Sequence, residues 1–201
     1  MKNLYVGRWM FALMLLVFCP SATSAPQFEF PNDADFVLLE YHQWIPRIAN
    51  QDQQPLLRIY GNGQVVVHFP DYMKQAGDYE MTLPQQKLNI LLGSLEQNGI
   101  FSFDQKKVKQ LKIQSENFQK SNSLEFSTRS EEVISDIRIN LALFSPDASG
   151  SPIPGFSKIF KWTNLKWDAQ KHADVPELVN AAAAEQQLDE LLNHPDLKKL
   201  K

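Results

Sequence analysis

Apolar runs separated by turn residues predict strands in the first third of the chain. Residues 35–44 contain Phe36-Val37-Leu38-Leu39, a run that is typical of a buried strand. Residues 56–60 and 64–69 form two further apolar runs, and these flank Gly61-Asn62-Gly63. Asn-Gly favours a two-residue turn because both positions of that turn need a positive φ. The pattern therefore predicts a β-hairpin.

The turn also predicts which hairpin residues lie opposite each other. With Asn62 and Gly63 at the tip, Tyr60 pairs with Val65 across the two strands. One face then carries Leu57, Ile59, Val66 and His68, and the other carries Leu56, Tyr60, Val65, Val67 and Phe69. Because both faces are largely apolar, we expect the hairpin at the centre of a sheet that is covered on part of each side.

Two helical patterns follow the hairpin, after a strand at residues 79–83 in which apolar and polar residues alternate. Residues 84–98 carry a single leucine stripe, and Gly99 ends that helix. Residues 104–112 predict a short helix that turns two apolar residues inward and its lysines to water.

The second half of the chain predicts three more strands and a final helix. Residues 124–126 and 137–143 indicate a second hairpin, and residues 157–163 indicate a further strand. The last helix covers about residues 176–194, and Asp174 lies where an N-terminal cap is expected.

These elements predict one α+β domain over residues 26–201. In it, an antiparallel sheet with a central β-hairpin packs against two main helices, at residues 84–98 and 176–194. Residues 145–155 are rich in Pro, Ser and Gly, so we expect a flexible loop there.

One part of this pattern is similar to known sequences. The hairpin segment Leu57-Arg58-Ile59-Tyr60-Gly61-Asn62-Gly63, the leucine-striped helix and Gly99-Ile100-Phe101 resemble modules in uncharacterised exported bacterial proteins. The resemblance covers about residues 56–104. It implies an α+β fold, and no known activity or catalytic residue accompanies it.

The first 25 residues have the pattern of a secretory signal peptide. Lys2 and Arg8 give a positive start, residues 9–19 are apolar, and small residues follow, with cleavage expected after Ser24 or Ala25. A membrane anchor is less favoured, because a span needs about 20 apolar residues and Arg8 shortens this run. Lipid attachment at Cys19 is also less favoured, because Phe18 and not a small residue precedes it.

Removal of this leader changes the composition of the chain. It takes away the single cysteine and two of the 20 Lys and Arg residues, which leaves 18 basic against 23 acidic residues and a net charge of −5. The mature chain then has no disulfide or thiolate ligand, and no basic excess for nucleic acid. We expect a periplasmic or secreted protein of a Gram-negative envelope, with no stable membrane span after cleavage.

The stretch with the character of an interaction surface combines aromatic and basic residues. Its candidate binding residues are Phe156, Lys158, Lys161, Trp162, Lys166 and Trp167. Aromatic faces stack on sugars and ammonium groups meet anions, so we expect an envelope protein or an anionic glycan as partner. Alternating aromatic and basic residues are also typical of a strand with one buried face.

No motif for an enzyme, a metal or a cofactor stands out. The four histidines lack metal-ligand spacing, and there is no Gly-rich phosphate loop or serine nucleophile motif. We therefore expect a binding or accessory protein and not an enzyme, with no metal and no cofactor. One alternative is an envelope hydrolase that uses Glu40, His42, Asp168 and His172. Another is an inhibitor of a secreted enzyme that acts through the loop at 71–77 or at 147–155.

Overall fold

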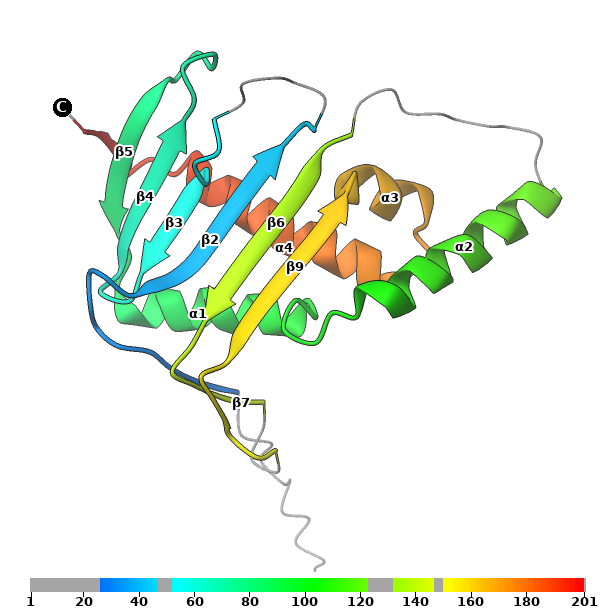
Figure 1. Cartoon of the computed structure of the whole chain (residues 1–201), viewed down its shortest axis with the longest axis horizontal. Coiled ribbons are helices and arrows are strands. Elements are labelled where there is room, and N and C mark those ends of the chain that lie inside the picture. Colours follow the sequence, from blue (N-terminus) through cyan, green and yellow to red (C-terminus); the bar gives the residue numbers. More distant parts are fainter. Residues whose placement is uncertain (1–25, 47–51, 123–131, 147–149, 201) are drawn as a thin grey trace, which may run out of the picture.

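The protein has a mixed α+β fold that is built on two antiparallel sheets (Figure 1). The computed structural model describes residues 26–46, 52–122, 132–146 and 150–200. In this part of the chain the larger sheet has seven strands in the order β10-β5-β4-β3-β2-β6-β9, and the smaller sheet has the order β1-β7-β8. The predicted fold class is confirmed.

The larger sheet consists of β10 (Lys198–Lys199), β5 (Gly77–Thr82), β4 (Gln64–Phe69), β3 (Leu57–Tyr60), β2 (Val37–Trp44), β6 (Ile134–Asn140) and β9 (Ser157–Thr163). The smaller sheet consists of β1 (Gln27–Glu29), β7 (Leu143–Ser145) and β8 (Ile153–Pro154). The helices are α1 (Gln85–Gln97), α2 (Gln105–Asn122), α3 (Leu165–Lys171) and α4 (Pro176–Leu192).

In the described part of the chain, helices cover one face of the larger sheet and not the other. Figure 1 shows α1 and α4 crossing behind the strands, with no described segment in front of them. The core lies between these layers: Leu57 and Ile59 of the sheet and Leu178 and Leu188 of α4 are fully buried. We call the other side of the sheet the open face. A sheet with one packed and one solvated face carries apolar and polar residues in alternation, as β3 and β4 do here.

The hairpin lies at the centre of the sheet, as predicted, but its predicted register is wrong. Val65 pairs with Ile59, because the turn has three residues. Gly63 takes a positive φ of 89°, whereas Asn62 does not, and the Asn62 side chain accepts a hydrogen bond from the Gln64 backbone N–H at 2.9 Å.

The shift of one residue changes the faces of β4. Val65, Val67 and Phe69 are buried under the helices, while Val66 and His68 lie on the open face. The open face of the hairpin is therefore more polar than the sequence pattern predicted.

The middle of the chain differs from the prediction in two further places. α2 is twice the expected length, and Asp104 holds its start by accepting hydrogen bonds from the backbone N–H groups of Lys106 and Lys107. The strand predicted at 137–143 is divided between β6 and β7, which belong to different sheets. Its predicted hairpin partner at 124–126 lies outside the described residues, and β6 pairs with β2 and β9.

Two other predictions concern the ends and loops of the chain. The signal peptide expected at 1–25 lies outside the described residues. Within the described part, each helix is too short or too polar to span a bilayer. In the predicted loop at 145–155, Ile153 and Pro154 form β8, which pairs with β7.

Candidate functional site

The six candidate binding residues are divided between the two sides of the sheet. Alternation along β9 turns Lys158 and Trp162 toward the helices and Lys161 toward the open face. Trp162 is only 4% exposed, and the Lys158 ammonium donates a hydrogen bond to the Phe103 carbonyl at 2.8 Å. Burial lowers the pKa of Lys158.

The remaining candidates have their own partners. Phe156 stacks on Phe101 with ring centroids 5.2 Å apart. Lys166, at the start of α3, donates a hydrogen bond to Asp189 at 2.5 Å, and the Lys171 ammonium lies 4.6 Å from the ring of Trp167. The six side chains therefore do not form one surface. Binding through Lys161, which is exposed on the open face, stays a prediction.

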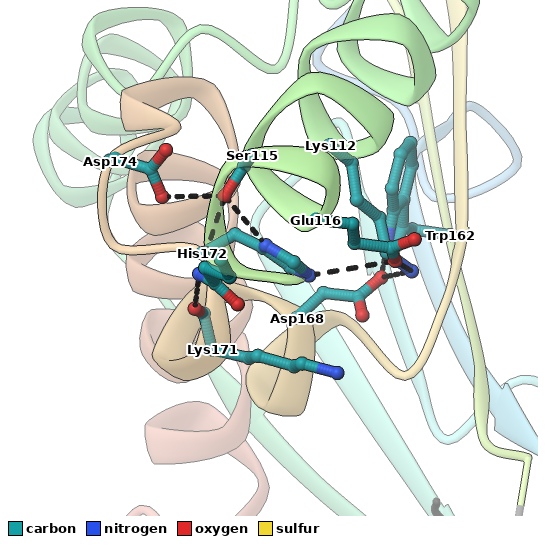
Figure 2. Close-up of polar contacts among 9 residues, drawn as sticks. Lys112, Ser115, Glu116, Trp162, Asp168, Lys171, His172 and Asp174 are labelled. Carbon is teal, nitrogen blue, oxygen red and sulfur yellow. Dashed lines mark hydrogen bonds and ion pairs between the residues drawn. The ribbon is translucent and has the colours of Figure 1, made fainter. Parts of the chain in front are cut away.

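A serine, a histidine and an aspartate meet where α2 docks on the α3–α4 region (Figure 2). The Ser115 hydroxyl lies 2.9 Å from His172 Nδ1 and donates a hydrogen bond to Asp174 Oδ1 at 2.8 Å. The predicted role of Asp174 as a helix cap is wrong, because Val175 occupies the N-cap of α4 without a side-chain hydrogen bond.

A second group of polar contacts continues the cluster along α2. Asp168 is 2% exposed, and its Oδ2 accepts hydrogen bonds from Lys112 Nζ and from Trp162 Nε1, both at 2.8 Å. Gln119 donates a hydrogen bond to the Lys171 carbonyl, also at 2.8 Å. These contacts join α2 to α3 and to β9.

The geometry of this cluster does not activate Ser115 as a nucleophile. Ser115 is 4% exposed, and its hydroxyl donates its proton to Asp174 and lies beside His172 Nδ1, while His172 Nε2 lies 3.7 Å from Glu116 Oε1. Burial lowers the pKa of His172. A serine nucleophile must be within reach of its substrate, and Ser115 is buried. The cluster therefore docks α2 by buried hydrogen bonds.

The four residues of the alternative hydrolase site lie in two separate places. Glu40 and His42 are on β2 at the open face, where Glu40 accepts a hydrogen bond from Arg58 at 2.9 Å. Asp168 and His172 are buried on the helix side, under α2. The fold does not bring the two pairs together in one cleft.

Ion pairs and aromatic rings cover the open face. Arg58 pairs with Glu40, and Arg138 of β6 donates two hydrogen bonds to Asp136 at 3.1 and 3.2 Å. Beside them, the ring of Trp44 lies 4.7 Å from the Lys161 ammonium. The face thus offers both signs of charge and a cation–π pair.

His68 joins the β2–β3 loop to the outer strands of the open face. Its Nε2 lies 2.7 Å from Asp52 Oδ2, and its Nδ1 lies 2.6 Å from Asp78 Oδ1. Partial burial opposes a charge on His68, but the hydrogen bonds to Asp78 and Asp52 outweigh it and raise the pKa. Sequence reasoning missed this contact, because the predicted register placed His68 on the same face as the buried Leu57 and Ile59.

Comparison with known proteins gave no relatives. No protein-family model, curated protein or solved structure matches this chain. Among the described residues, no group of three or more His, Cys, Asp or Glu side chains has the geometry to hold a metal ion. The function of the chain is therefore inferred from its geometry.

Proposed function

We propose that this chain is an exported binding or accessory protein of a bacterial envelope, with no enzymatic activity of its own. Its partner is an envelope protein or a glycan, and it binds on the open face of the seven-stranded sheet. The leader pattern of residues 1–25 supports export to the periplasm or the medium.

The observation that carries the proposal is the one-sided cover of the sheet. A sheet of this width has two faces, and among the described segments helices pack on only one of them (Figure 1). The open face adds aromatic and apolar groups to its charges: Ile159 is 63% exposed there, next to Lys161 and Trp44. Interfaces combine such apolar or aromatic centres with a polar rim.

The charges of the open face favour a protein over a strongly anionic glycan. Arg58 and Arg138 are already paired with Glu40 and Asp136, and the Lys161 ammonium lies against the ring of Trp44. Binding to a polyanion gains its strength from many unpaired cations. A partner protein with charges of both signs fits this face better.

The buried polar cluster supports a role in binding and not in catalysis. The serine, histidine and aspartate that meet there are hydrogen-bonded to one another, and His172 is fully buried. A hydrolase would need a nucleophile that its substrate can reach.

Two exposed isoleucines offer a matched test of the proposed surface. Ile159 on the open face and Ile90 on α1 are 63% and 58% exposed, and they lie on opposite sides of the sheet. The mature chain, its Ile159→Asp variant and its Ile90→Asp variant are immobilised, and the material that each retains from envelope extract is measured. We expect Ile159→Asp to reduce retention about tenfold, and Ile90→Asp to leave it unchanged.

Treatment of the extract with a protease or with a glycan-degrading enzyme identifies the class of partner. Loss of retention after protease treatment supports a partner protein, and loss after glycan digestion supports a glycan. Equal retention by the two variants would contradict binding on the open face. Export is tested separately by N-terminal sequencing: cleavage gives a chain that starts at Ala25 or Pro26, and an intact Met1 contradicts it.

A further inference from the structure

The larger sheet ends in two strands of very different length. β10 has two residues, so little backbone is left unpaired at that edge, whereas β9 has seven. β9 contains no proline, and its pairing with β6 has no bulge. The Lys161 ammonium lies over Trp44 of β2, so this charge is turned away from the edge. Short strands, prolines, bulges and charges are the usual protection of a sheet edge, and the β9 edge lacks it.

Alternate residues of β9 turn their backbone groups away from β6. Asn164, just after the strand, donates its N–H to the Val133 carbonyl, just before β6. In an antiparallel register every second residue repeats this bonding, so Phe160 is bonded to β6, whereas Ile159 and Lys161 point their N–H and C=O groups outward. Among the residues that the structure describes, none forms a hydrogen bond with these outward groups. They are free to pair with a further strand.

The helix α2 lies beside this edge and makes it basic. Lys112 of α2 bonds to Asp168, which also accepts from Trp162 of β9, and Figure 1 shows α2 continuing past β9. α2 has five lysines and one glutamate, and β9 has two lysines and no acidic residue. Lys109 is exposed and lies three positions before Lys112, on the same side of the helix. A segment that pairs with β9 therefore meets mainly positive charge.

We propose that an extended acidic segment of the partner protein adds to the sheet as a further strand beside β9. The proposal rests on the binding at the open face described above and names the form that the partner takes. The segment bonds to the outward backbone groups of Ile159 and Lys161. One row of its side chains lies beside Ile159 on the open face, and carboxylates of the other row meet Lys109.

A second copy of the whole chain fits this edge less well than a single segment does. The helices of that copy would meet α2, which projects past the edge (Figure 1). Its own β9 would also bring two more lysines to the pairing, where the edge is already basic. A single extended segment meets neither obstacle, because it needs only the width of one strand.

The probe for strand addition is the peptide acetyl-Glu-Val-Glu-Val-Glu-Val-Glu-amide, whose carboxylates and valines lie on opposite faces of a strand. Amide hydrogen exchange of the mature chain is measured by NMR with and without it. The Phe160 N–H is bonded to β6 and should exchange slowly in both states. We expect the peptide to slow exchange at Ile159 and Lys161 at least about tenfold, and a peptide with Lys in place of Glu to have no such effect. Unchanged exchange, or equal slowing by both peptides, would overturn the proposal.

Charge reversals on α2 test the acidic character of the segment. Lys109→Glu should weaken the binding of the glutamate peptide about tenfold. Lys120→Glu makes the same change on the same helix about 16 Å further along, where α2 has passed β9, and should have little effect. Equal affinity of the two variants for the peptide would overturn the contact with α2.

Two variants at position 161 separate strand addition from binding on the open face. Lys161→Ala keeps the outward N–H, and Lys161→Pro removes it without loss of a bond to β6, so retention from envelope extract should be about tenfold lower in Lys161→Pro. If Ile159→Asp lowers retention but a folded Lys161→Pro matches Lys161→Ala, the open face binds and strand addition is wrong. If neither Ile159→Asp nor Lys161→Pro lowers retention, both proposals fail. The exchange experiment uses the wild-type chain and decides the question if Lys161→Pro does not fold.

Discussion

Asp168 gives the sharpest prediction about the buried cluster, because it holds three elements together. Its Oδ2 accepts from Lys112 of α2 and from the indole N–H of Trp162 in β9, while Asp168 itself lies on α3. Replacement of Asp168 by Ala removes both hydrogen bonds. Because the cluster docks α2, we expect this change to destabilise the fold and to loosen α2.

The expected size follows from the burial of each partner. Trp162 is 4% exposed, and a buried N–H that loses its acceptor costs about 1–3 kcal/mol. The Lys112 side chain is 26% exposed, so its ammonium turns to water and the loss of the ion pair adds only about 1 kcal/mol. We therefore expect Asp168→Ala to lower the free energy of unfolding by about 3 kcal/mol.

Urea unfolding followed by circular dichroism measures this cost, and amide hydrogen exchange shows whether α2 is the element that loosens. Trp162→Phe provides the control, because it keeps an aromatic ring and removes the N–H. In the Trp162→Phe background, Asp168→Ala should cost about 1–2 kcal/mol less than in the wild-type chain. A cost below about 1 kcal/mol in the wild-type background, or an equal cost in both backgrounds, would refute the role given to Asp168.

Two further predictions concern the hairpin and pH. Gly63→Ala should destabilise the fold by about 2–4 kcal/mol, because a Cβ there would lie 2.2 Å from a backbone carbonyl oxygen of the β5–α1 loop and φ is +89°. Gly99→Ala is the control: φ there is +76°, but a Cβ would meet no atom within 4 Å, so the cost should be only about 1 kcal/mol. Thermal unfolding of both variants checks this, and equal costs would contradict it. For His68, the hydrogen bonds to Asp52 and Asp78 raise the pKa above the ordinary value of 6.5, so its stabilising effect is complete below about pH 6.5 and is lost as the pH rises through the raised value. Unfolding between pH 5 and 9 should show this loss in the wild-type chain and not in His68→Gln, and identical pH profiles would argue against the contact.

The sequence predicted most strands of the larger sheet correctly, because the position of a strand follows from the pattern of apolar, polar and turn residues within it. Apolar runs and turn residues located the central hairpin, and alternation along 157–163 indicated a strand with one buried face, as β9 has. The predicted register was wrong because the turn has one residue more than expected, and a shift of one residue moves every side chain of β4 to the opposite face of the sheet. Gly61, Asn62 and Gly63 suit a two-residue or a three-residue turn, and the choice depends on contacts outside the hairpin: Gly61 N–H donates to the Phe36 carbonyl, and Leu83 N–H to the Gly63 carbonyl.

The polar clusters were harder to predict, because they join residues that are distant in sequence. Ser115 and His172 are 57 positions apart. Ser115 follows Val108 and Leu111 at helical spacing, which places it on the inward face of α2, but that spacing does not identify His172 as its partner. The position of Glu185 could be predicted from the sequence. It continues the inward series Leu178, Ala181, Leu188 and Leu192, so a charged residue occupies a core position of α4. A carboxylate at such a position predicts buried hydrogen-bond partners, although the pattern does not identify Ser135 or Gln43.

Site-specific photo-cross-linking in cells that export the protein shows whether the open face is the binding surface. A photoreactive amino acid replaces Ile159 in one variant and Ile90 in the other, two side chains of similar exposure on opposite sides of the sheet. After illumination, we expect a discrete cross-linked product of higher mass from position 159 and none from position 90. Cross-linking at position 90 alone, or to the same extent at both positions, would contradict it.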